Sequence, residues 1–283
     1  MRELMEVGDC IESGCYRLHS RFRHALVFAR ENDKSDPPAS AGLACLVEEG
    51  LAGPTNIVVR SLTLTRVDSF DFTAGCLFVG GVALPIERRY DSSLRIGPLD
   101  AGRLFVNMRA FEDALRTLAP PASIVFLLGD DNPDGAFDRA LALRFRNAIK
   151  RLTAGDLEGG AAMLCGLGRG LTPSGDDFLA GFLLGLNGLE LATGIDLREE
   201  HRRICSHAVT ANDFSRLLLR HASEGRCIAP VKSLVETLFD GQRDGMAVAT
   251  RRLVAVGASS GADLGVGVAW AMRMYADRVS KPC

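Results

Sequence analysis

Long apolar stretches are missing from this sequence. The longest ones, Phe178–Leu186 and Leu264–Met272, reach at most half the length that a helix needs to cross a bilayer. The N-terminus carries charged side chains where a signal peptide would have an apolar core. We therefore expect a cytoplasmic protein with no membrane partner.

Clusters of one charge and paired cysteines are also scarce. The 283 residues carry a net charge of −2 and contain no basic run, which argues against nucleic acid as a partner. Eight cysteines are scattered without a Cys-x-x-Cys pair, so neither a zinc knuckle nor a thioredoxin-type site is expected. A chain of this length has an ample core without disulfides, and we expect reduced thiols.

Signatures of several catalytic classes are absent. There is no His-Glu-x-x-His motif for zinc. Ser215 could form a hydrolase triad with Asp213 and with His207 or His221, but no Gly-x-Ser-x-Gly elbow surrounds this serine. The segment Gly170–Gly175 has the glycine spacing of a P-loop, but two aspartates follow where Lys-Ser/Thr is required. Asp130–Gly135 begins like a calcium loop, but Leu141 occupies the position of the bidentate glutamate. We therefore predict no metal ligands.

The N-terminal part, residues 1–110, has the pattern of a β domain. Val- and Thr-rich segments at Asn56–Arg60 and Leu62–Val67 predict strands, and Gly80-Gly81 predicts a hairpin turn. Leu104–Met108 is interpreted as a last short strand. Together these segments predict a small, mainly antiparallel barrel or sandwich-like domain. Asn107 and Arg109, at the end of that last strand, are candidate anion contacts.

The remainder, residues 111–283, has the 3.6-residue periodicity of helices. The whole chain is therefore predicted to be α+β, with an all-helical C-terminal half. Five apolar residues at Ile124–Leu128 do not distinguish a strand from a helix. From there on we expect helices near 137–154, 157–167, 176–192, 197–209, 213–224, 230–240, 244–256 and 261–279.

A polar, glycine-rich loop precedes the most apolar of these helices. Gly166, Gly168 and Gly170 permit positive φ and close approach to the backbone. Pro173 should keep the residue before it out of a helix, and Ser174 is a suitable N-cap. The loop is thus predicted to bring Thr172, Ser174, Asp176 and Asp177 to the mouth of a buried helix.

The same pattern recurs 86 residues later. Ser174-Gly175-x-Asp177-x-x-x-Gly181 is matched by Ser260-Gly261-x-Asp263-x-x-x-Gly267. Continued upstream without a gap, the alignment has nine identities in thirty positions, against about three by chance for this composition. We interpret this as an internal duplication of units at about 148–186 and 234–272. A pseudo-twofold pair would bring both polar loops to one site.

Two interpretations of these loops are open. Ser-x-x-Asp at a helix start resembles a capping box, worth on the order of 1 kcal/mol per cap. The glycines, the second acid and the repetition exceed what a cap needs, and favour a site for a small molecule that has both an anionic end and N–H groups. Its catalytic candidates are Asp176 and Asp177. Its candidate substrate or anion contacts are Asn107, Arg109, Gly170, Thr172, Ser174, Gly175, Ser260, Gly261 and Asp263. No organic cofactor is indicated, and Mg²⁺ is left open because a cation could bridge acids and an anion.

The run Gly-x-Gly-Leu-Thr-Pro-Ser-Gly-Asp-Asp-x-Leu-x-Gly, from Gly168 to Gly181, resembles the hallmark of a bacterial family. That family includes the smallest subunit of the oxamate carbamoyltransferase of allantoin and oxalurate catabolism, and relatives described as carboxylases. Gly257–Asp263 resembles the family's second, shorter motif, with Ser259 in place of a threonine. The resemblance covers about the last 150 residues.

The resemblance implies a subunit that acts with larger partners related to acyl-CoA synthetases. Together they would convert a carbamoyl-bearing acid such as oxalurate, with phosphate, to carbamoyl phosphate and an amide acid. We therefore expect a carbamoyl- or acyl-transfer enzyme subunit. A non-catalytic binding or assembly subunit of such a complex is the alternative, and a metal-dependent hydrolase acting alone is a third hypothesis.

Overall fold

The computed structural model divides the chain into two compact units. Unit 1 contains Met1–Ser92 and Cys227–Ala229, and unit 2 contains Ser93–Arg226 and Pro230–Cys283. The residues that the structure describes are 4–22, 24–31, 42–48, 50–59, 67–98, 100–131, 133–241 and 243–279.

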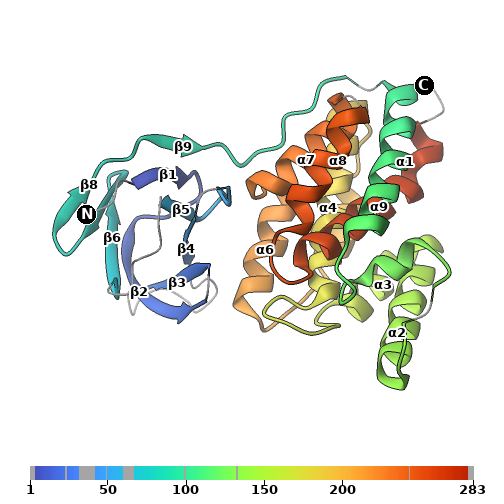
Figure 1. Ribbon diagram of the computed structural model, residues 1–283, viewed down its shortest axis with the longest axis horizontal. Helices are drawn as coiled ribbons and strands as arrows, with labels where there is room; N and C mark the ends of the chain where they lie inside the picture. The colour runs from blue at the N-terminus through green and yellow to red at the C-terminus, as the bar shows by residue number, and fades with distance from the viewer. Residues whose placement is uncertain are drawn as a thin grey trace. The chain divides into compact units, whose positions relative to one another are not determined.

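The described part of unit 1 forms nine strands in one curled sheet (Figure 1). The spatial order is β8-β7-β6-β2-β3-β4-β5-β1-β9, and only the β1–β9 and β4–β5 pairs are parallel. The sheet is therefore mainly antiparallel. Its strands are β1 (Leu4–Gly8), β2 (Gly14–Arg21), β3 (Ala25–Arg30), β4 (Leu43–Val47), β5 (Asn56–Val59), β6 (Ser69–Thr73), β7 (Cys76–Val79), β8 (Val82–Leu84) and β9 (Arg88–Tyr90).

Aromatic side chains fill the concave core of this sheet. Tyr16, Phe28 and Phe70 are at most 2% exposed, and the Tyr16 and Phe70 rings stack with centroids 4.8 Å apart. The predicted hairpin is confirmed, because Gly80 and Gly81 both have positive φ between β7 and β8. The strand predicted at Leu62–Val67 lies outside the described residues except for Val67.

Unit 2 is helical, as the periodicity predicts. Where the structure describes the segment from residue 136 onward, eight helices lie within a few residues of the expected positions. The helices of unit 2 are α1 (Ala101–Leu118), α2 (Ala136–Thr153), α3 (Leu157–Leu164), α4 (Ser174–Thr193), α5 (Arg198–Cys205), α6 (Asp213–Ser223), α7 (Ala229–Asp240), α8 (Arg243–Val254) and α9 (Ser260–Val279), with a 3₁₀ helix, η1 (Ile124–Leu128). In the described ranges no helix combines the length and apolar character that crossing a bilayer requires.

The prediction of a strand at Leu104–Met108 is wrong, because these residues belong to α1. Asp100 caps this helix by accepting a hydrogen bond from the Arg103 N–H at 3.0 Å. Leu104, Phe111 and Leu115 then recur on one buried face at helical spacing. A five-residue window contains too little of that repeat to separate it from strand alternation.

Helices α4 and α9 form the centre of unit 2 (Figure 1). Every residue from Ser174 to Leu186 is buried. A Cβ on Gly181 would lie 1.9 Å from the Leu264 carbonyl oxygen, and a Cβ on Gly267 would lie 2.0 Å from the Phe178 carbonyl oxygen. The two contacts are reciprocal, so both helices need glycine at the crossing.

We expect Gly181→Ala to destabilise the protein by about 1–3 kcal/mol or more, because the added methyl overlaps a backbone atom that cannot turn aside. Denaturant unfolding measures this loss. Gly102→Ala is the matched control, since its methyl would meet nothing closer than 3.5 Å in the first turn of α1. Equal stability of the two variants would contradict the close crossing.

Candidate functional site

The loop between α3 and α4 has the backbone that its glycines predict. Gly166, Gly168 and Gly170 have φ of 71°, 121° and 106°, values that favour glycine. A Cβ on Gly168 would lie 2.7 Å from the Ser174 nitrogen. The loop is therefore folded tightly against the start of α4.

The interpretation of Ser174 as an N-cap is wrong. Pro173 holds the cap position with an extended backbone, and no side chain caps the helix. The amide of Gly175 donates to Leu167 O at 2.7 Å, and the amides of Asp176 and Asp177 both donate to Pro173 O. An anion could reach these three N–H groups only by displacing protein carbonyls. The Ser174 side chain forms a hydrogen bond with Asp263 instead.

The second loop ends on α9 in a related way. The Gly261 amide donates to Val256 O at 3.0 Å, as the Gly175 amide donates to Leu167 O. A Cβ on Gly261 would lie 1.9 Å from Leu253 O, and a Cβ on Gly175 would lie 1.9 Å from Leu164 O. By this contact Leu253 corresponds to Leu164, whereas the ungapped alignment pairs it with Leu167. The first loop is therefore three residues longer, and the internal duplication remains a prediction.

The two polar loops meet through their hydroxyl groups. The Oγ1 of Thr172 lies 3.2 Å from the Oγ of Ser260 and donates to Oδ2 of Asp177 at 3.1 Å. Hydrogen bonds cross between the two segments, because Ser260 bonds Asp177 and Ser174 bonds Asp263. The serine of each segment thus hydrogen-bonds to the aspartate of the other segment. We call these five residues the Ser/Thr/Asp cluster.

Asp263 has two further donors. Its Oδ1 accepts the Ile124 N–H at 2.8 Å, and its Oδ2 accepts the Ser259 hydroxyl at 3.0 Å. This carboxylate therefore holds the first residue of η1 against the start of α9. Fixing the backbone at Ile124 is a structural role, and Asp263 has it in addition to its contact with Ser174.

Asp176 faces a different group of atoms. Its Oδ1 accepts the Gly166 N–H at 2.7 Å, which ties the carboxylate to the glycine loop. The Cys165 thiol adjoins it, and burial together with this carboxylate raises the pKa of Cys165 to about 11. The thiol is therefore protonated and a weak nucleophile at neutral pH.

Burial dominates the electrostatics of the cluster and of the neighbouring carboxyl group of Asp176. Asp176, Asp177 and Asp263 are 0%, 1% and 0% exposed. Burial, reinforced by the Asp263 charge, raises the pKa of Asp177 to about 8, although hydrogen bonds from Ser260 and Thr172 oppose the rise. Burial also raises the pKa of Asp263 to about 6. At neutral pH Asp177 therefore carries a proton while Asp263 is ionised.

This arrangement places a proton donor and a proton acceptor beside hydroxyl groups. Such a pair can carry out general acid–base chemistry on a group that reaches it. Thr172 and Ser260 are the members of the cluster that retain partial exposure. Within the described ranges no three His, Cys, Asp or Glu side chains are placed to hold a metal ion.

The other predicted contacts, Asn107, Arg109 and Gly170, are not members of the Ser/Thr/Asp cluster. Asn107 is buried on α1, and its amide donates to the carbonyls of Thr237, Leu238 and Gly241 at 3.0–3.2 Å. It therefore closes the C-terminal end of α7. Arg109 is exposed on the same helix. Gly170 shapes the first loop through its positive φ, alongside the cluster.

A cavity of about 450 Å³ adjoins the glycine loop. Its walls come from the loop, from α3 and from α2, and include Arg144, Met163, Cys165, Gly166 and Gly168. Arg144 is the one charged side chain among the described residues that line this cavity. Sequence reasoning missed Cys165 and Arg144 as neighbours of the loop, because nothing local to α2 or α3 indicates what they face. Ser259 was noted only as a departure from a motif.

Comparison with known proteins finds one similarity, and it lies in this region. Residues 164–272 match the family model described as oxamate carbamoyltransferase subunit AllH. The match includes both polar loops and most of α4 and α9, and it confirms the family resemblance drawn from the two motifs. No curated protein and no solved structure matches the chain.

The shifted carboxyl groups predict a pH dependence of stability. Between about pH 4 and 8 the folded chain retains a proton on Asp177 that the unfolded chain releases, so stability falls as pH rises. Asp263 contributes to this fall only up to about pH 6. From pH 6 to 8 we expect wild type to lose stability more steeply than Asp177→Asn, by up to about 1.4 kcal/mol per pH unit. Denaturant unfolding at each pH measures both slopes.

Asp113→Asn is the control, because Asp113 is an exposed acid on α1. This variant should keep the wild-type slope. Parallel curves for wild type and Asp177→Asn would refute the raised pKa of Asp177.

Asn107 can be tested as a helix-closing residue. We expect Asn107→Asp to lower stability by several kcal/mol, because a carboxylate would face three carbonyl oxygens without a proton to donate. Thermal unfolding above pH 6 measures the loss. Arg109→Gln, two residues away on the exposed side, should leave stability within about 0.5 kcal/mol of wild type. A stable Asn107→Asp variant would return this residue to the list of ligand contacts.

Proposed function

We propose that the chain is a subunit of an oxamate carbamoyltransferase-like enzyme that acts on a small carboxylic acid such as oxalurate with phosphate. The observation that carries this proposal is the family match over residues 164–272, which spans both polar loops. A subunit implies larger protein partners in the working enzyme. The internal pseudo-twofold arrangement of the two segments is part of the same proposal, supported by the reciprocal Gly181 and Gly267 contacts.

The proposed reaction needs a proton on the inner nitrogen of oxalurate, which is the leaving group. A phosphate oxygen attacks the carbamoyl carbon of oxalurate, and the bond from that carbon to the inner nitrogen breaks. The nitrogen takes up a proton and leaves as the amide of oxamate, while the phosphate loses one. The products are carbamoyl phosphate and oxamate.

The Ser/Thr/Asp cluster has suitable chemistry for that proton transfer. A carboxyl group with a pKa of about 8, such as Asp177, retains a proton near neutral pH and can donate it to the leaving nitrogen. Asp263, with a pKa of about 6, is the matching acceptor. Thr172 and Ser260 would contact the substrate, and Asp176 would position the glycine loop. Arg144, in the adjoining cavity, would attract a carboxylate.

A second candidate function rests on the burial of the cluster. Carboxylates that are 0–1% exposed cannot touch a substrate unless Thr172 and Ser260 move aside. This observation favours a non-catalytic binding or assembly subunit, in which the cluster holds the two loops in shape for a partner protein. The loops would then act as a docking surface.

Reconstitution with the larger subunits distinguishes the two functions. We expect Asp177→Asn to assemble normally and to lower carbamoyl phosphate formation from oxalurate and phosphate by about 10²-fold or more, the typical contribution of a general acid. Asp113→Asn in the same complex is the matched control.

The other outcomes are equally informative. Wild-type activity in an assembled Asp177→Asn complex would establish the binding or assembly role. A complex that assembles but never forms carbamoyl phosphate from oxalurate would overturn the proposed reaction. Activity of the isolated chain would remove the need for partners.

A further inference from the structure

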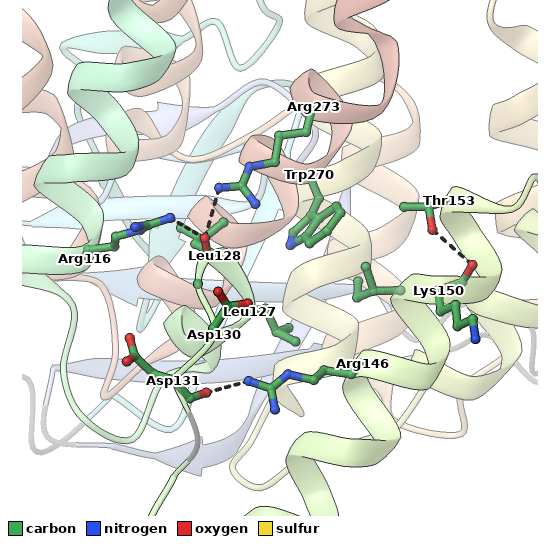
Figure 2. A pocket seen from close by; sticks show the side chains of 12 residues that line it. Arg116, Leu127, Leu128, Asp130, Asp131, Arg146, Lys150, Thr153, Trp270 and Arg273 are labelled. Carbon is green, nitrogen blue, oxygen red and sulfur yellow. Dashed lines mark hydrogen bonds between the residues drawn. The ribbon is translucent and has the colours of Figure 1, made fainter.

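A second large cavity of unit 2 has no member of the Ser/Thr/Asp cluster in its lining. It measures about 760 Å³ and opens between α1, η1, α2 and α9. Its lining includes four cationic side chains, two carboxylates and an indole (Figure 2). These are Arg116, Arg146, Lys150, Arg273, Asp130, Asp131 and Trp270. This concentration of positive charge contrasts with the chain's net charge of −2.

Two of the guanidinium groups are held in place by the protein. Figure 2 shows Arg116 and Arg273 turned toward the Leu128 carbonyl, which accepts a hydrogen bond from each, the latter at 3.1 Å. Glu112 forms a bidentate pair with Arg273 at 2.6 and 2.7 Å, and lies 4.0 Å from Arg116. Arg273 is thus neutralised, while Arg116 keeps most of its five N–H donors for another acceptor.

The positive charge of the opposite wall comes from α2. Arg146 donates to the Asp131 carbonyl and lies over the Phe126 ring at 5.7 Å, which fixes its position. Lys150 lies one turn further along α2, and within the described residues its ammonium group makes no ion pair. Asp130 and Asp131 also line the cavity, but both are exposed, so water screens their charge.

We propose that this cavity binds a small oxyanion, either a carboxylate or a phosphate group. Lys150 and Arg146 would supply charge from α2, and Arg116 would supply N–H donors from α1. Preorganised guanidinium groups suit such a ligand, because planar N–H pairs match two oxygens of a carboxylate or phosphate. Side chains already fixed by Leu128 and Phe126 lose little conformational freedom on binding.

Trp270 makes binding directly observable. It is the only tryptophan in the chain and lies in the wall of the cavity. Arg273 stands over its ring at 5.3 Å, and its Nε1 is buried with no hydrogen-bond partner in the described part of the chain. A ligand that alters this surrounding charge should change tryptophan fluorescence.

The test is a fluorescence titration of the full chain with oxamate, with inorganic phosphate and with sodium chloride at matched ionic strength. We expect a saturable change at millimolar concentration or below with oxamate or phosphate, and none with chloride. The responding ligand identifies the carboxylate or the phosphoryl group as the source of the oxyanion. Lys150→Gln should weaken binding by about tenfold or more, since a charged hydrogen bond is lost.

Arg139→Gln is the matched control, because it removes the same charge from an exposed position on α2 outside the cavity. It should bind within about twofold of wild type. Lys150 is also exposed, so its substitution should leave the fold intact, and thermal unfolding verifies this. The proposal is overturned if chloride gives the same change, if neither anion gives one, or if Lys150→Gln and Arg139→Gln bind alike. None of these measurements uses carbamoyl transfer, so their failure would leave the proposed function standing.

Discussion

The backbone-to-backbone crossing of α4 and α9 determines where the polar parts of unit 2 lie. Gly181 meets the Leu264 carbonyl and Gly267 meets the Phe178 carbonyl, so neither helix can shift along the other without a steric overlap. Each glycine follows an aspartate of the cluster by four residues, about one helical turn. The crossing therefore brings Asp177 and Asp263 together below two loops that are far apart in the sequence.

Bringing these acids together has an electrostatic cost that local hydrogen bonds only partly offset. Water is excluded from both carboxyl groups, and each is close enough to the other segment to bond its serine. The raised pKa values of Asp177 and Asp263 express that balance, because desolvation outweighs the hydroxyl donors. Buried, ionisable groups of this kind occur at functional sites and in structural networks. The match to the family model covers the segment that contains them.

Much of the helical unit could be predicted from periodicity, because helical spacing repeats over many residues and averages out local ambiguity. Short segments were harder. Leu104–Met108 has the composition of a strand, but its neighbours up to Leu115 continue a buried helical face. Strands β1, β2 and β4 were not anticipated individually, since their own patterns are weak. Asn107 was assigned to ligand binding because a strand end suggested it, whereas tertiary packing directs its amide to the carbonyls at the end of α7.

The sequence by itself determined the α+β class, the glycine loop with its positive φ angles, the buried character of α4 and the family resemblance. These properties depend on residue type and short-range spacing, which the sequence states directly. Only the tertiary structure decided that Ser174 bonds Asp263 instead of capping its own helix, and that Asp177 is sealed from water. It also placed Lys150 and Arg146 opposite Arg116 around one cavity. Burial and the pairing of distant side chains depend on how the helices pack, and no local pattern encodes the partner that a side chain will meet.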